Sequence, residues 1–205
     1  MRDVVLATIL VLLLTPVFLV LAFAVAVSSP GPILFRQTRV GRGRQTFVML
    51  KFRTMAVGSD DRTHREFVTH MFLESAQTQD DESGLGNNPC KLVEDERVTR
   101  VGRRLRHLSL DELPQLFNVL AGHMSLVGPR PTLPWEVELF QAQHLVRFNV
   151  KPGMTGLWQV RGRSTLTMPQ ALDIDIEYIE RRSFWLDLSI LLRTLPAVLS
   201  GRGAS

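Results

Sequence analysis

The chain has 205 residues, of which 45% are hydrophobic and 21% charged, and its formal net charge is +4 at pH 7. With nearly half its residues apolar, the chain can bury a sizeable core, and its positive charge favours anionic partners such as phosphates, nucleotides or a lipid surface. The single cysteine excludes an internal disulfide framework and is typical of a reducing compartment.

The N-terminal segment is uncharged from residue 4 to residue 27, long enough to cross a hydrocarbon core roughly 30 Å thick. Pro16 removes a backbone N–H and leaves the Leu12 carbonyl without its helical donor, so we expect a bend. The hydroxyl of Thr15 is expected to bond that carbonyl. A bent helix can enter and leave by the same face, and hydropathy alone is compatible with both a re-entrant and a spanning helix.

Charges on the two sides of this segment predict its orientation. Basic residues crowd its C-terminal side, whereas only Met1, Arg2 and Asp3 precede it. The C-terminal side is therefore expected to be cytoplasmic.

A short β-hairpin is predicted next, with strands at 33–35 and 47–52 joined by a Gly/Arg turn at 40–44. Next to a membrane, the arginines of this turn would meet lipid phosphates. Taken as an isolated pair, Lys51 and Arg53 at the end of the second strand are expected to be solvated surface charges.

The sequence then becomes polar and irregular. It predicts one amphipathic helix over 65–76 and a surface loop over 77–89. The two histidines of this stretch have no spacing that suits a metal site.

The most informative stretch is 108–131, LSLDELPQLFNVLAGHMSLVGPRP. It puts Asp111 and Glu112 at the start of a predicted helix, where Ser109 and Glu112 fit a capping box and Pro114 is tolerated. Apolar residues at helical spacing predict one buried face, made of Leu110, Leu113, Phe117 and Leu120.

Two interpretations of these acids remain open on the pair alone. Acidic residues in a first helical turn commonly do no more than stabilise the helix. Alternatively, one is a nucleophilic or metal-binding carboxylate among arginines that hold phosphates.

The C-terminal part predicts a helix over 135–148 and a glycine-rich loop over 151–163, where Arg161 and Arg163 supply charge. A further helix is expected over 168–182, with three acids that cannot share one face. The last segment, 184–199, is apolar but too short and too charged to span. An interfacial helix and a packed core helix are equally compatible with it.

Six segments carry a resemblance to a known family. They occur in the order SPGPILFRQTRVGRG, KFRTM, RVTRVGRRLR, LSLDELPQLFNVLAGHMSLVGPRP, KPGMTGLWQVRGR and WLDLSILLRTLPAVLSGRGA. Together they closely resemble the bacterial sugar transferases, the monotopic polyprenyl-phosphate sugar-1-phosphate transferases or phosphoglycosyl transferases. The similarity covers nearly everything except roughly residues 57–94.

The resemblance implies an α+β fold: a re-entrant membrane helix, a short β-hairpin and a mostly helical catalytic domain with interfacial amphipathic helices. Residues 1–30 would form the membrane helix, broken at Thr15-Pro16 where the family has Ser-Pro. Residues 31–205 would form a catalytic domain on the cytoplasmic face of the bacterial inner membrane, with 57–94 as a variable insertion. No βαβ series predicts a nucleotide-binding parallel sheet.

The implied activity moves a sugar-1-phosphate from a UDP-sugar to a polyprenyl phosphate such as undecaprenyl phosphate, and releases UMP. This step initiates exopolysaccharide, O-antigen or glycoconjugate synthesis. By the match, Asp111 is the nucleophile, forms a phosphosugar intermediate and contacts Mg²⁺, and Glu112 assists as base or metal-side partner. Asp3 falls on the family's acidic position at the start of the membrane helix.

This chemistry is physically reasonable, because a carboxylate attacks a pyrophosphate only if cations neutralise the phosphates. One or two carboxylates plus substrate phosphates suffice to bind Mg²⁺. The expected substrate-binding cations are Lys51, Arg106, Arg130 and Arg163.

A different class remains as the alternative: a non-catalytic, membrane-anchored module that binds nucleotides or anionic lipid. A nucleic-acid binder is disfavoured, because the basic residues are scattered among motifs. The expected partners are a UDP-sugar, a polyprenyl phosphate and membrane lipid, and the sequence is compatible with a homo-oligomer.

Overall fold

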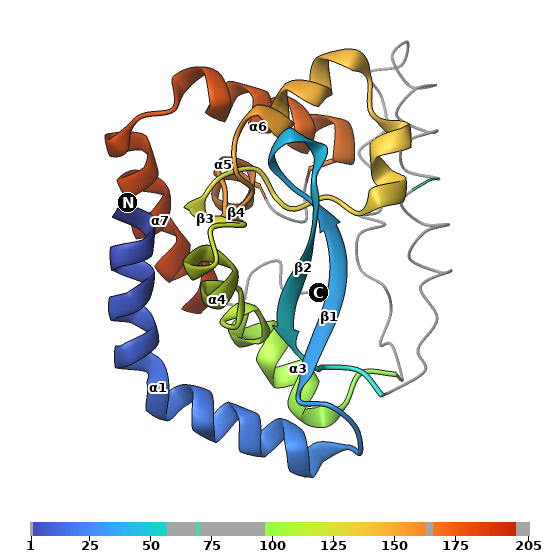
Figure 1. Ribbon diagram of the computed structural model, residues 1–205, viewed down its shortest axis with the longest axis vertical. Coiled ribbons are helices and arrows are strands. Elements are labelled where there is room, and N and C mark those ends of the chain that lie inside the picture. The colour runs from blue at the N-terminus through green and yellow to red at the C-terminus, as the bar shows by residue number, and fades with distance from the viewer. Residues whose placement is uncertain (1, 57–68, 70–96, 163–165, 200–205) are drawn as a thin grey trace.

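The computed structural model describes residues 2–56, 69, 97–162 and 166–199 (Figure 1). The amphipathic helix predicted over 65–76, the loop over 77–89 and Arg163 lie outside the part described. The N-terminal half contains α1 (Arg2–Ser28), β1 (Leu34–Val40), η1 (Arg42–Arg44), β2 (Thr46–Phe52), α3 (Arg100–His107), η3 (Leu110–Glu112) and α4 (Gln115–Leu120). It is followed by β3 (Ser125–Val127), η4 (Pro134–Leu139), η5 (Ala142–Asn149), β4 (Gly153–Thr155), α5 (Leu157–Arg161), α6 (Met168–Arg181) and α7 (Phe184–Leu199).

Helix α1 is one continuous helix of 27 residues that bends about halfway along its length (Figure 1). Pro16 lies inside it, and the hydroxyl of Thr15 donates to the carbonyl of Val11 at 2.8 Å. The expected bond to Leu12 was therefore wrong. A hydroxyl in a helix commonly reaches the carbonyl four residues back, and such a bond helps to bend the helix.

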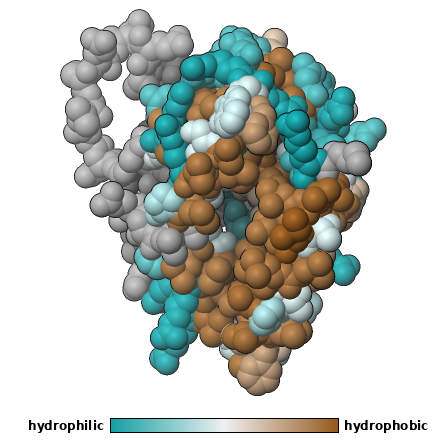
Figure 2. All heavy atoms as spheres, turned by 90° about the vertical axis from the view of Figure 1, so that its left-hand side faces the viewer, coloured by the Kyte–Doolittle hydropathy of each residue, from teal (hydrophilic) through white to brown (hydrophobic). Residues whose placement is uncertain are grey.

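Most apolar side chains of α1 point away from the protein. Among the described helices, α1 alone is long and apolar enough to cross a membrane. Figure 2 shows the side of the molecule on which α1 and α7 lie in Figure 1. The exposed residues of α1 form part of the hydrophobic face on this side. A continuous apolar surface of this kind favours contact with lipid.

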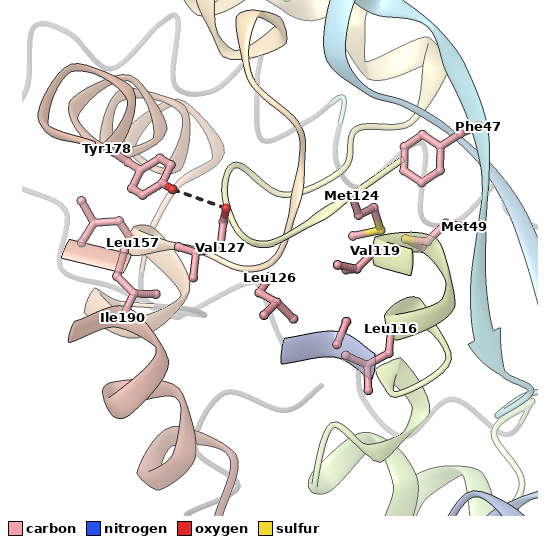
Figure 3. Close-up of a cluster of buried hydrophobic side chains, with 11 residues drawn as sticks. Phe47, Met49, Leu116, Val119, Met124, Leu126, Val127, Leu157, Tyr178 and Ile190 are labelled. Atoms are coloured by element: carbon pink, nitrogen blue, oxygen red, sulfur yellow. Dashed lines mark hydrogen bonds between the residues drawn. The ribbon is translucent and has the colours of Figure 1, made fainter. Parts of the chain in front are cut away.

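Two buried clusters join α1 to the rest of the chain. The larger one packs β2 and α4 against β3, α5, α6 and α7, and includes Ala7 of α1 (Figure 3). At one side of the cluster, the hydroxyl of Tyr178 donates to the carbonyl of Val127 at 3.3 Å (Figure 3). The smaller cluster contains Val25, Phe52 and Leu105. Both halves of the bent helix therefore pack on the same body.

Arg53 also joins the C-terminal end of α1 to the β-hairpin. Its guanidinium is buried and donates to the carbonyls of Val25, Ser29 and Pro32. The solvated surface position expected for Arg53 was wrong. Because the last carbonyls of a helix lack internal donors, a buried arginine there stabilises the helix end.

The β-hairpin is confirmed, with antiparallel pairing from Leu34↔Phe52 to Val40↔Thr46. The turn lies where it was predicted, and Gly43 and Arg44 adopt positive φ angles there. The first strand is longer than expected and runs to Val40, because the polar side chains of this stretch lie along a strand fully paired with β2. Strands β3 and β4 form a second, parallel pair. They were not predicted, since strands of three residues are too short to have a periodic signal.

The single helix predicted over 135–148 was wrong. Two 3₁₀ helices, η4 and η5, lie there, separated by Phe140 and Gln141 in extended conformation. Tertiary contacts override the helical pattern, because His144 and Arg147 of η5 are buried against partners on α6.

Helices α6 and α7 confirm the predicted segments. In α7, Ile190 is buried in the core while Trp185 is 75% exposed. Core packing is therefore confirmed for one face of α7, and interfacial binding of the other face stays a prediction.

Candidate active site

The two acidic residues form a short 3₁₀ turn of their own, η3, between α3 and α4. The predicted capping box was wrong, because Ser109 adopts a left-handed conformation (φ 51°) and its side chain caps nothing. Pro114 lies directly before α4, as its position near the helix start predicted. The acids are thus held in a turn that precedes the helix.

The predicted buried face of this stretch was also wrong in part. The buried residues of α4 include Leu116 and Val119, whereas Phe117 is 42% exposed. The ring of Phe117 lies 5.5 Å from the ring of Phe18 in α1, measured between centroids. Because α1 covers this side of α4, the opposite side packs into the core.

A buried asparagine joins α4 to the hairpin. The side chain of Asn118 accepts a hydrogen bond from the Leu50 N–H at 3.0 Å and donates to the Val48 carbonyl at 2.7 Å. It therefore bonds β2 as a neighbouring strand would. This contact brings the strand that carries Lys51 alongside the acids.

Lys51 lies between the two carboxylates. Its Nζ is 2.7 Å from Oε1 of Glu112 and 3.9 Å from Oδ2 of Asp111. The side chain of Lys51 is only 18% exposed, so the expectation of a solvated surface charge was wrong. An ammonium in this position offsets part of the negative charge of the two acids.

Asp111 is 8% exposed, and burial raises the pKa of its carboxyl. Lys51 opposes this shift, Glu112 adds to it, and Arg106 lowers the pKa again. The carboxylate is therefore poorly hydrated yet has cations beside it. This is the environment in which a carboxylate can act as a nucleophile.

Arg106 is oriented by the segment that follows β2. Its Nε donates to the hydroxyl of Thr54 at 2.9 Å. At Gly102 of α3, an added Cβ would lie 2.1 Å from the Thr54 carbonyl oxygen, so only glycine permits this packing. The close approach places Arg106 near enough to Asp111 for its charge to lower the pKa of that carboxyl.

Arg130 lies in a turn whose backbone is held at four consecutive carbonyls. The donors are the Gly153 N–H to Pro129 (2.8 Å), Nη2 of Arg147 to Arg130 (2.7 Å), Nη1 of Arg39 to Pro131 (3.0 Å) and the Val40 N–H to Thr132 (2.8 Å). Hydrogen bonds from several segments immobilise the main chain that carries Arg130. The guanidinium itself remains exposed for a ligand.

One cleft brings most of these side chains together. It is lined by Lys51, Glu112 and Arg130 from the predicted set, and by residues that the sequence did not single out: Arg39, Met49, Gln115, Pro131, Gly153, Met154 and Gln159. Of the predicted cations, Arg163 lies outside the described residues. The cleft thus joins a carboxylate and cations beside the buried nucleophile candidate.

Gln159 and Arg39 are the residues in this cleft that sequence reasoning missed. The Oε1 atom of Gln159 is buried and has no hydrogen-bond partner within the described part of the chain. The glycines around it indicated close backbone approach, but nothing in the pattern distinguished this glutamine. Arg39 is buried in a strand whose sequence is otherwise typical of an exposed hairpin.

The acidic pair also suits a divalent cation. Asp111 and Glu112 supply two carboxylates with hard oxygen ligands. The described residues contain no group of three His, Cys, Asp or Glu side chains that could hold a metal by themselves. This donor set fits Mg²⁺, which binds one or two carboxylates and completes its shell with water and substrate phosphates.

The chain is similar to known proteins over most of its length. Residues 1–201 match the family described as bacterial sugar transferase. The chain is 39% identical over 202 residues to the exopolysaccharide production protein ExoY of Sinorhizobium fredii, covering 98% of this chain and 85% of that protein. It is 43% identical over 206 residues to the UDP-glucose:undecaprenyl-phosphate glucose-1-phosphate transferase of Caulobacter vibrioides, covering 97% and 68%.

The Escherichia coli UDP-glucose:undecaprenyl-phosphate glucose-1-phosphate transferase is 40% identical over 202 residues, which cover 95% of this chain and 38% of that protein. The match includes the acidic turn, the hairpin and the helices that surround the cleft, because it extends over nearly the whole chain. The chain therefore belongs to the bacterial sugar transferase family.

Proposed function

We propose that the chain is a membrane phosphoglycosyl transferase that moves a sugar-1-phosphate from a UDP-sugar to undecaprenyl phosphate or a similar polyprenyl phosphate. It releases UMP and begins the assembly of an exopolysaccharide or related glycoconjugate. The observation that carries the proposal is the buried Asp111 beside Lys51 and Glu112, in a chain of this family. The names of the relatives support the two substrates.

In the first step, an oxygen of Asp111 attacks the phosphorus that bears the sugar. The bridging oxygen leaves with UMP, and a sugar phosphate remains bound to the carboxylate as a mixed anhydride. Lys51, Arg106 and Arg130 offset the negative charge of the pyrophosphate, which would otherwise repel the carboxylate.

In the second step, an oxygen of the polyprenyl phosphate attacks the same phosphorus and frees Asp111. The product is a polyprenyl diphosphate sugar. Covalent catalysis suits two unlike substrates, because the nucleotide leaves before the lipid phosphate reacts. Glu112, held by Lys51 at 2.7 Å, can hold a proton released from the acceptor phosphate.

Asp111 and Glu112 are the residues that would hold Mg²⁺ together with the substrate phosphates. When bound, the ion supplies Lewis-acid stabilisation of phosphate charge. The side chains already present orient the pyrophosphate and exclude part of the solvent from the carboxylate.

For topology, the proposal is that α1 enters and leaves the membrane by the cytoplasmic face of the bacterial inner membrane. Both of its ends bind the same body. Near the N-terminal end of α1, the hydroxyl of Ser125 donates to the carboxylate of Asp3 at 2.5 Å. Just beyond its C-terminal end, the guanidinium of Arg53 donates to the carbonyls of Ser29 and Pro32. A spanning helix would require the bond between Asp3 and Ser125 to break, so an extracytoplasmic tag at the N-terminus would overturn this topology.

The test of function is Asp111→Asn in the purified full chain with Mg²⁺, a panel of UDP-sugars and undecaprenyl phosphate. We expect no UMP release and no adduct, while the wild type without acceptor is labelled by sugar phosphate at position 111, detected by mass spectrometry. Glu180→Gln, which changes an exposed acid on α6 to its amide, is the control and should behave as wild type.

A non-catalytic module that binds nucleotide or anionic lipid predicts the opposite result. UMP release by the folded Asp111→Asn variant at the wild-type rate would overturn the proposed mechanism. Failure of the wild type to release UMP from every sugar nucleotide would overturn the enzyme assignment.

A further inference from the structure

A second cavity, of about 280 Å³, lies at the start of α1 and shares no lining residue with the catalytic cleft. Five separate parts of the chain supply its polar groups. It is lined by Asp3, Arg42, Ser125, Asn149, Val150, Lys151 and Arg182. Neither the family match nor the relatives' names assign a ligand to it.

The charges of this cavity are unbalanced. Arg42, Lys151 and Arg182 supply three cations, and Asp3 is the one carboxylate among its lining residues. Asp3 already accepts a hydrogen bond from Ser125. Within the described part of the chain, none of the three cations forms a salt bridge, so each can bind an anion.

The cavity lies at the edge of the apolar face. Asp3 lies in the first turn of the exposed apolar helix α1, and Arg182 lies two residues before Phe184, the first residue of α7. The Arg2 guanidinium lies 5.0 Å from the centre of the Phe184 ring, which ties the two helix starts together. Figure 2 shows hydrophilic residues above the hydrophobic surface at this end of the molecule.

The polar side chains that line the cavity are suited to binding a phosphate group. Two guanidinium groups offer paired donors to phosphate oxygens, the ammonium of Lys151 adds a compact charge, and Asn149 adds an amide. The adjoining exposed rings of Phe184 and Trp185 are typical of side chains at the membrane–water interface.

We propose that this cavity binds the phosphate headgroup of an anionic phospholipid, whose acyl chains lie along the apolar surfaces of α1 and α7. The inference rests on the proposed membrane attachment and goes beyond the reaction, because this lipid is neither donor nor acceptor. A bound headgroup anchors the start of α1 at the interface. Free phosphate is the other source of the same chemistry.

The test uses the full chain in nanodiscs of phosphatidylcholine with phosphatidylglycerol, and native mass spectrometry of the lipids that stay bound. The pocket variant is Arg42→Gln/Lys151→Gln/Arg182→Gln. The control, Arg36→Gln/Arg100→Gln/Arg104→Gln, loses the same number of positive charges at exposed positions outside the cavity. Arg42→Gln alone, in an exposed turn, provides a milder variant.

We expect the wild type and the control to retain phosphatidylglycerol preferentially, and the pocket variant to lose this preference at least about tenfold. Each cation near a charged surface contributes roughly 1 kcal/mol, or about a factor of five in affinity. Arg42→Gln alone should lose a smaller part of the preference. An equal loss in the pocket variant and the control would overturn the proposal, because it would indicate non-specific charge attraction.

Inorganic phosphate added to the same nanodiscs distinguishes the two sources. If it displaces phosphatidylglycerol at millimolar concentration, the cavity is a site for free phosphate and the lipid assignment is overturned. UMP release is measured in parallel. Its absence in the wild type would overturn the proposed reaction but not the lipid site.

Discussion

The guanidinium of Arg147 donates to the carboxylate of Asp175 at 2.9 Å, and both side chains are buried. Burial lowers the pKa of Arg147 and raises that of Asp175, because both charges lose hydration. The same Nη2 atom of Arg147 also donates to the Arg130 carbonyl. A residue of α6 thus orients the turn that presents Arg130 to the cleft.

Replacing Arg147 by methionine should destabilise the protein strongly. The Asp175 carboxylate would be left buried without its partner, and such losses typically amount to about 3–5 kcal/mol. Thermal unfolding of the detergent-solubilised chain measures this. Arg181→Met, which removes an exposed guanidinium paired with Glu177, should change stability by no more than about 1 kcal/mol.

The double variant Arg147→Met/Asp175→Leu separates stability from positioning. It should regain much of the stability, because no buried charge is left alone, while kcat/KM for UMP release stays low because the Arg130 carbonyl still lacks its donor. Recovery of both quantities would show that the pair acts on stability alone.

Asp175 should make stability depend on pH in an unusual direction. Its pKa is raised to about 6 from 3.8. Between those values the folded chain binds more protons at this site than the unfolded chain, so the contribution to stability falls as pH rises. Relative to Asp175→Asn, the wild type should lose about 2 kcal/mol between pH 4 and 6. A difference in unfolding temperature that is constant over this range would contradict the prediction.

Lys51→Gln should move the acid limb of the pH–rate profile to higher pH. Lys51 lowers the pKa of Asp111, so its removal lets burial and Glu112 raise that pKa further. The ionised nucleophile then forms only at higher pH, and kcat/KM for UMP release reports this pKa in the unliganded enzyme. Lys51→Arg should restore the position of the limb. An unchanged limb in Lys51→Gln would mean that another group titrates.

Gln159→Leu tests whether the buried Oε1 atom binds the donor substrate. The leucine keeps a similar volume but cannot accept a hydrogen bond, so KM for the UDP-sugar should rise about fivefold while the unfolding temperature stays close to wild type. Gln141→Leu, at an exposed position, is the control. An unchanged KM in Gln159→Leu would exclude this contact.

The sequence by itself determined the elements that depend on local signals. The apolar N-terminal run with Pro16, the hairpin with its Gly/Arg turn and the last two helices lie where they were predicted. Asp111, Glu112 and Arg130 were also singled out as candidate site residues, because one continuous motif carries all three. Local periodicity and proline or turn chemistry specify such features without reference to distant residues.

The tertiary structure alone decided which side chains meet. Lys51 contacts Glu112 because Asn118 bonds the edge of β2, and local spacing contains no sign of that pairing. Capping by Ser109 and the single helix over 135–148 both failed. In the 135–148 segment, the contacts of His144 and Arg147 with α6 outweighed local preferences worth a few tenths of a kcal/mol per residue. The hydrogen bonds from Arg39 and Arg147 to the turn that carries Arg130 likewise form only in the folded chain, because they join residues that are distant in sequence. Burial makes each of these hydrogen bonds costly to lose.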